Sequence, residues 1–102
     1  MTKWNEDQEK IIAQYESKLP FTDRETYLAW RAEWRENYAA LSADIRRLRR
    51  EIAVSGSNVS WKVWSERNYK SSEASDQMLI RAASKRKAGK LRAAAKAEKV
   101  AA

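Results

Sequence analysis

An apolar side chain recurs about every 3.6 residues over 27–52, and this is the period of an α-helix. The positions are Tyr27, Trp30, Trp34, Tyr38, Leu41, Ile45, Leu48 and Ile52. On a helical wheel they fall in a stripe about 80° wide, which is narrower than the apolar face of an ordinary globular helix. A narrow stripe is typical of a helical hairpin or a coiled coil. The sequence therefore predicts a long helix over 23–54, roughly 48 Å long at ~1.5 Å per residue.

Pro20 separates this long helix from a shorter amphipathic helix over 5–19, because the residue before a proline is disfavoured in the helical conformation. The apolar side of the shorter helix consists of Trp4, Ile11, Ile12, Tyr15 and Leu19. The run that starts at Thr22 fits a capping box, with the Thr22 hydroxyl as the cap of the long helix. We expect the two helices to pair as an antiparallel hairpin over 1–54. The remainder of the apolar stripe then needs the C-terminal region, a second copy of the chain or a partner.

The chain beyond Gly56 is expected to contain a linker with a short helix and then a basic helix. Glycine suits the left-handed position after a helix end, and Ser57 or Asn58 is the expected cap of the next element. Residues 59–69 alternate as in a strand, but a lone strand would have no partner, so a short helix is favoured. This segment lies in a region over 55–75 that ends in a polar joint over 70–75. We expect a basic helix or tail over 76–102. Its part from Ser84 onward is expected to be frayed or partly helical when free and ordered when bound, since no apolar stripe continues there. The fold class is all-α.

The residue types present exclude several kinds of site. The chain has no Cys and no His, so disulfides, Cys/His zinc sites and His-dependent nucleophile systems are ruled out. Glu33 and Glu36 are carboxylates without a third ligand in view, and we expect them to pair with arginines. Gly-rich phosphate loops are absent. We therefore expect no enzyme activity, cofactor or metal.

The sequence also predicts a protein of the cytoplasm that does not enter the membrane. No apolar run approaches the ~18 residues of a membrane span. The start of the chain, Met1–Asp7, is too polar and acidic for a signal peptide.

Charge is divided unevenly along the chain. Residues 46–102 hold 15 of the 21 Lys and Arg residues and five of the 14 acidic residues, a net charge of +10, whereas residues 1–45 carry −3. A basic half favours a polyanion or an acidic partner. The candidate binding cations are Arg46, Arg47, Arg49, Arg50, Lys62, Arg67, Arg81, Lys85, Arg86, Lys87, Lys90, Arg92, Lys96 and Lys99. The alternatives are an acidic protein surface, a solubilising tail and, for the four clustered arginines, a solvated helix face.

Trp61 and Trp64 lie outside the apolar stripe, beside Lys62 and Arg67. Aromatic side chains next to cations are typical of interface anchors and of base-stacking surfaces. These two tryptophans are therefore predicted either to close the core or to form an aromatic interface.

The segment Tyr27-Leu28-Ala29-Trp30-Arg31-Ala32-Glu33-Trp34-Arg35, continuing to Leu48-Arg49-Arg50, resembles small uncharacterised helical proteins of tailed bacteriophages. That resemblance implies a small accessory or host-takeover factor that acts on a nucleic-acid machine in the host cytoplasm. The Lys/Ala-rich tail is similar in composition to extensions of ribosomal and nucleoid proteins.

Taken together, these patterns predict a binding protein without catalytic activity. The favoured partner is nucleic acid, RNA or DNA, or a nucleoprotein complex, contacted by the basic C-terminal half. One alternative is an inhibitor or accessory protein that binds a host protein through the long helix or through Trp61 and Trp64. Another is a structural coiled-coil subunit, and a homodimer is compatible with each.

Overall fold

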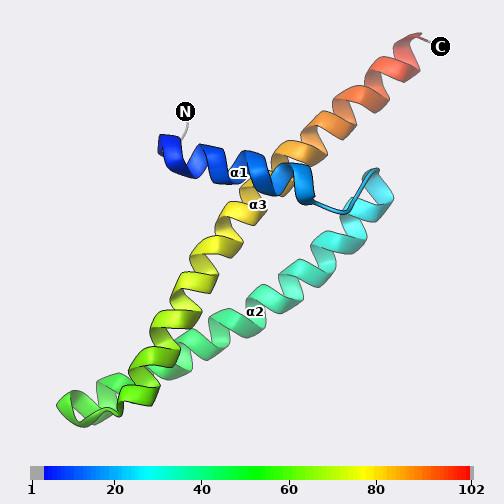
Figure 1. Cartoon of the computed structure of the whole chain (residues 1–102). Coiled ribbons are helices and arrows are strands. Elements are labelled where there is room, and N and C mark those ends of the chain that lie inside the picture. The colour runs from blue at the N-terminus through cyan, green and yellow to red at the C-terminus, as the bar shows by residue number, and fades with distance from the viewer. Residues whose placement is uncertain (1–3, 102) are drawn as a thin grey trace. The chain divides into compact units, whose positions relative to one another are not determined.

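The computed structural model describes residues 4–101 and is built from helices (Figure 1). Its elements are α1 (Glu6–Lys18), α2 (Arg24–Ser55), a short 3₁₀ helix η1 (Gly56–Asn58) and α3 (Trp61–Ala101). No strand occurs in the described part of the chain. The all-α class and the long second helix are confirmed. The ends of the predicted 1–54 and 76–102 segments, residues 1–3 and 102, lie outside the described residues.

Two compact units make up the chain. We call the residues up to Ala32 together with those from Met78 the terminal unit, and Glu33–Gln77 the hairpin unit. The terminal unit thus contains α1, the start of α2 and the C-terminal part of α3, and the hairpin unit contains the rest of α2 and α3 with η1 between them.

Side-chain hydrogen bonds define where α1 and α2 begin. Asn5 Oδ1 accepts from the Gln8 amide at 2.8 Å, and Gln8 Oε1 accepts from the Asn5 amide at 2.9 Å, which forms a capping box. At α2 the cap is Asp23, whose Oδ1 accepts from the Thr26 amide at 2.8 Å. The Thr26 hydroxyl in turn accepts from the Asp23 amide at 3.1 Å. The predicted capping box, with Thr22 as the cap, is therefore wrong, because the cap is Asp23, one residue later. A carboxylate at this position also interacts favourably with the helix N-terminus.

The ends of α1 and α2 lie where the sequence predicts them. Leu19, immediately before Pro20, is extended with φ −66° and ψ 134°. Gly56 follows the last residue of α2 with φ +59°, in the left-handed region that glycine adopts without strain.

The third helix differs from the prediction at its start and in its middle. Its cap is Ser60, whose Oγ accepts from the Val63 amide at 3.3 Å, whereas the predicted caps Ser57 and Asn58 lie in η1. The predicted joint over 70–75 is wrong, because α3 continues through it as one helix of 41 residues. No Gly or Pro lies within 70–75, and Ser75 Oγ donates to the Ser71 carbonyl at 3.2 Å inside the helix. Polar composition alone does not end a helix.

In the terminal unit, α1 packs against α3. Ile12 is fully buried in a cluster with Leu79 and Ala83. Partly buried Trp4, Tyr15, Leu19 and Ala82 surround this cluster. The predicted pairing of the first helix with the second is therefore replaced by pairing with the third. Alanines at 82 and 83 allow this, because small side chains let two helix axes approach closely.

The loop between α1 and α2 adds a second buried group to the terminal unit. Phe21 is 1% exposed. Its ring centroid lies 5.0 Å from that of Tyr27 in an edge-on arrangement and 5.5 Å from that of Trp30. The first two positions of the apolar stripe of α2 therefore pack on this loop residue.

The hairpin unit is an antiparallel pair formed by α2 and α3. Its cross-helix contacts are Trp34 Nε1 to Gln77 Oε1 at 2.7 Å, Asp44 to Lys70 at 2.7 Å and Arg47 to Glu66 at 3.7 Å. Residue numbers rise along α2 as they fall along α3, as an antiparallel pair requires. Ile45 and Leu48 are buried, so the C-terminal region covers this part of the apolar stripe.

Candidate nucleic-acid interface

The predicted binding cations are distributed over both units. Those in the terminal unit, all on α3, are Arg81, Lys85, Arg86, Lys87, Lys90, Arg92, Lys96 and Lys99. Those in the hairpin unit are Arg46, Arg47, Arg49, Arg50, Lys62 and Arg67. The structure separates cations that contact other parts of the chain from cations that lie exposed to solvent.

Arg86 belongs to the first kind. Its Nη1 lies 2.7 Å from Glu9 Oε2 and its Nη2 lies 2.9 Å from Glu9 Oε1, so the guanidinium and the carboxylate meet through two parallel hydrogen bonds. Hydrogen bonding to Arg86 holds the pKa of Glu9 below its ordinary value, and the same bonds raise the pKa of Arg86. This cation joins α3 to α1.

Two lysines on the same side of α3 have similar roles. Lys87 Nζ donates to the carbonyl oxygen of Leu19 at 2.6 Å and lies 5.1 Å from the centroid of the Phe21 ring. Lys90 Nζ lies 2.6 Å from Glu16 Oε1. Three of the eight predicted cations of the terminal unit thus hold α3 to α1 and to the loop after it.

The other five form one exposed face, which we call the cationic ridge. It consists of Arg81, Lys85, Arg92, Lys96 and Lys99, all exposed. At ~100° per residue they fall within about 60° around the axis of α3, and the ridge is ~27 Å long. Within residues 4–101 none of the five forms an ion pair. The expectation that the chain from Ser84 onward has no side to bury is wrong, since Ser84 and Ala88 are buried on α3.

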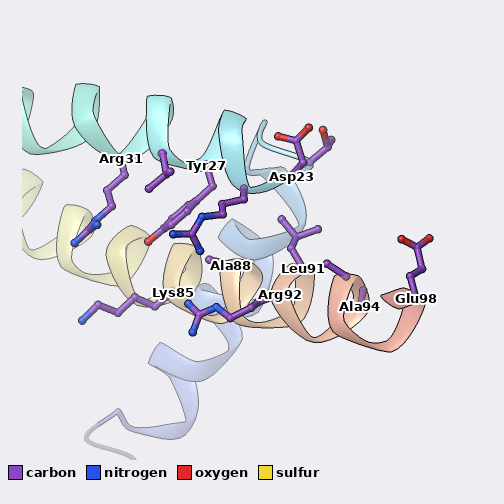
Figure 2. Close-up of a pocket in the computed structure, with 13 residues that line it drawn as sticks. Asp23, Tyr27, Arg31, Lys85, Ala88, Leu91, Arg92, Ala94 and Glu98 are labelled. Carbon is purple, nitrogen blue, oxygen red and sulfur yellow. The ribbon is translucent and has the colours of Figure 1, made fainter. Parts of the chain in front are cut away.

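A groove with a volume of about 760 Å³ lies beside the ridge, between the first turns of α2 and the C-terminal half of α3. Its lining residues are Thr22, Asp23, Arg24, Tyr27, Leu28, Arg31, Lys85, Ala88, Leu91, Arg92, Ala94, Ala95 and Glu98. Figure 2 shows Arg31 and Lys85 toward one end of the groove and Glu98 at the other. Sequence reasoning missed Arg24 and Arg31; their spacing of seven residues places both on one side of α2.

In the hairpin unit, Arg47 is paired and its neighbours are not. Arg47 lies 3.5 Å from Glu51 and 3.7 Å from Glu66, with about half of each side chain exposed. Arg46, Arg49 and Arg50 are exposed and have no ion pair within the described part of the chain. The interpretation as a solvated helix face and the interpretation as a binding face both stay open for these three.

The start of α3 carries exposed aromatic side chains. Trp61 is 83% exposed, Tyr69 is 72% exposed and Trp64 is 38% exposed. The Arg67 guanidinium lies 5.6 Å from the centroid of the Trp64 ring, a cation–π contact. Lys62, next to Trp61, is exposed. Trp61 therefore does not close the core of the hairpin unit.

The described residues contain no group of three or more His, Cys, Asp or Glu side chains placed to hold a metal ion. Glu33 and Glu36, which were expected to pair with arginines, form no ion pair over 4–101. None of the helices described has both the length and the apolar character needed to cross a membrane. Comparisons with protein-family models, with curated proteins and with solved structures find no match.

Proposed function

We propose that this protein binds nucleic acid without catalysing a reaction, and that the cationic ridge makes the phosphate contacts. The observation that carries the proposal is the separation of cations on α3. Arg86, Lys87 and Lys90 are bound to α1 and to the loop that follows it, while the five ridge cations share one exposed face with no ion partner among residues 4–101.

The ridge has an energetic cost that a polyanion would offset. Arg81 with Lys85, Arg92 with Lys96, and Lys96 with Lys99 are like charges three or four residues apart on one helix. Such pairs destabilise a helix by roughly 0.2–0.5 kcal/mol each. Phosphate contacts remove that repulsion and release the counterions condensed on the nucleic acid. A bound polyanion would therefore stabilise the helix that carries these like charges.

The length of the ridge suits a phosphate backbone. At ~3.4 Å per base pair, a ridge of ~27 Å runs along about eight base pairs of duplex. Lysine and arginine contacts to phosphate position a protein on the nucleic acid without reading its bases. We therefore propose binding with little sequence preference, to RNA or DNA.

The test compares two variants that lose the same charge. Lys96→Gln/Lys99→Gln removes two ridge cations, and Lys10→Gln/Lys18→Gln removes two exposed lysines of α1. Both variants and the parent are titrated against labelled duplex DNA and RNA at several salt concentrations. Log affinity falls as log salt rises, and we expect this negative slope to be shallower in the ridge variant. The expected change is about 0.9 for each duplex phosphate that the protein no longer neutralises. Equal behaviour of the two variants, or no binding of the parent at low salt, would overturn the proposal.

The exposed aromatic residues of the hairpin unit support a second candidate function, binding to a host protein. Trp61 and Tyr69 expose most of their surface, and aromatic side chains are enriched among the residues that anchor protein interfaces. A pull-down with parent and Trp61→Ala protein, with and without nuclease, separates the two candidates. A partner that survives nuclease and is lost with Trp61→Ala supports protein binding.

Both candidates fit a small phage-type accessory factor of the host cytoplasm. This placement rests on the resemblance of residues 27–50 to small helical phage proteins.

A further inference from the structure

The groove of the terminal unit has an apolar floor that is open to solvent. Leu28 on α2 is 44% exposed, and Leu91 on α3 is partly exposed. Ala88, Leu91 and Ala95 follow one another at intervals of three and four residues, the spacing of a helix–helix seam. Ala88 is buried where the seam begins, and Ala95 is exposed farther along it. The seam therefore extends beyond the part that the described chain covers.

Cations border this floor on both sides. Arg24 and Arg31 come from α2, and Lys85 and Arg92 come from α3. None of the four has an ion pair within residues 4–101. Of the two acidic residues that line the groove, Asp23 already accepts hydrogen bonds from Thr26 as the cap of α2, and Glu98 lies at one end (Figure 2). An occupant with negative charge along both edges would complement these cations.

The dimensions and the lining fit a helix. From Lys85 to Glu98 the groove follows α3 for ~20 Å, the length of about 13 helical residues. Alanines at 88, 94 and 95 leave space into which large side chains of a second helix can insert. We infer that the groove binds an amphipathic helix of an acidic partner protein, with leucine-like residues on its inner face and Glu or Asp on both flanks.

The lining favours a helix over an unpaired nucleotide base. Tyr27 is the one aromatic residue among those that line the groove, and its ring already packs edge-on against Phe21 at 5.0 Å. Alanine side chains offer no surface for base stacking. Lys85 and Arg92 belong to both the ridge and the groove, whereas Arg81, Lys96 and Lys99 do not line the groove. Arg24 and Arg31 line the groove and are not ridge residues, so variants at these two arginines separate peptide binding from nucleic-acid binding.

The probe is a synthetic helical peptide of about 14 residues, with leucines three and four residues apart and glutamates beside them. Fluorescence anisotropy with the full chain measures its affinity. A peptide of the same composition in scrambled order, and one with lysine in place of each glutamate, serve as controls. We expect saturable binding of the acidic amphipathic peptide, at least roughly tenfold tighter than either control.

Matched variants place the peptide in the groove. Leu28→Gln alters the floor, and Ile11→Gln alters a similarly exposed apolar residue of α1, 38% exposed against 44% for Leu28. We expect Leu28→Gln to weaken binding by roughly tenfold or more, and Ile11→Gln to leave it unchanged. Arg24→Gln/Arg31→Gln should weaken peptide binding while leaving the salt slope for nucleic acid at the parent value. Circular dichroism confirms that each variant is folded.

Several outcomes would overturn the inference. These are no saturable binding at millimolar peptide, equal affinity for the scrambled peptide, and parent affinity in Leu28→Gln protein. A single-stranded oligonucleotide that binds the parent and loses its affinity in Leu28→Gln protein would assign the groove to nucleic acid instead. Dimerisation in sedimentation that Leu28→Gln abolishes would assign it to a second copy of the chain.

Discussion

Arg86 and Glu9, which are 77 residues apart in the sequence, meet through two hydrogen bonds of 2.7 and 2.9 Å between the guanidinium and the carboxylate. This ion pair joins the middle of α3 to the first turn of α1. It is partly shielded, with 35% of the Arg86 side chain and 32% of the Glu9 side chain exposed. The two side chains meet only once α1 has docked on α3. The ion pair therefore forms only when the terminal unit is folded.

The first prediction concerns pH. Because the pKa of Glu9 is lower in the folded chain than in the unfolded chain, Glu9 contributes stability that is fully present above the ordinary carboxyl pKa. That contribution is lost as pH falls through the depressed pKa, below about pH 4. Asp44, whose pKa is lowered by its hydrogen bond to Lys70, adds to this acid sensitivity.

Thermal unfolding at a series of pH values checks the prediction. Glu9→Gln should lower the melting temperature at pH 7 and show a smaller further loss on acidification than the parent. If the two proteins lose stability in parallel as pH falls, the ion pair does not contribute in solution.

The second prediction concerns the core of the hairpin unit. Leu48 is completely buried, whereas Leu41, nearer the middle of α2, is only partly buried. Leu48→Ala should reduce the free energy of unfolding by ~2–5 kcal/mol, since it leaves a cavity in a packed site. Leu41→Ala should cost less, because water fills part of the space. Urea unfolding of the two variants measures the difference, and a larger loss for Leu41→Ala would contradict the pairing of α2 with α3.

A third prediction addresses the alanine contact between α1 and α3. Ala83 is completely buried against Ile12, so Ala83→Leu forces extra volume into a filled site. We expect a loss of about 1–3 kcal/mol in the free energy of unfolding. Ala93→Leu makes the same change at an exposed position of the same helix and should have almost no effect. Denaturant unfolding of both variants tests the docking of α1; identical stabilities would place α1 elsewhere.

The fourth prediction concerns the two glycines. Substitution by alanine is expected to lower the free energy of unfolding at one of them and to raise it at the other. Gly56 has φ +59°, where an L-residue is strained, so Gly56→Ala should destabilise the chain by roughly 1 kcal/mol. Gly89 lies inside α3 with open space around an added Cβ. Gly89→Ala should therefore stabilise by about 0.4–1 kcal/mol, because alanine loses less conformational freedom on folding. Melting temperatures that shift in the same direction for both variants would contradict the assigned backbone conformations.

A fifth prediction concerns self-association through α2. Ile45 and Leu48 are buried within the chain, so the stripe from Leu41 to Ile52 does not need a second copy to cover it. We expect sedimentation velocity to show no dimer that depends on this face. The check is Leu41→Gln, which should leave the sedimentation coefficient unchanged across a wide range of protein concentration.

The positions of the first two helix ends follow from the sequence alone. Pro20 restricts Leu19, and Gly56 adopts a conformation that other residues avoid, so these boundaries depend on only a few neighbouring atoms. The apolar stripe of α2 is likewise local, since it requires nothing beyond the helical period. Weaker local signals were less reliable: Asp23 caps α2 in place of Thr22, and the serines near 71–75 remain inside α3.

The tertiary structure decided which helices pair and which cations stay exposed. Helical periodicity places Arg86, Lys87 and Lys90 on a different side of α3 from the ridge residues, but it does not show which side another helix covers. Their partners Glu9, Leu19 and Glu16 lie about 70 residues away and reach them only when α1 packs on α3. Whether a charge is bound within the chain or exposed depends on distances between elements, and helical periodicity does not contain those distances.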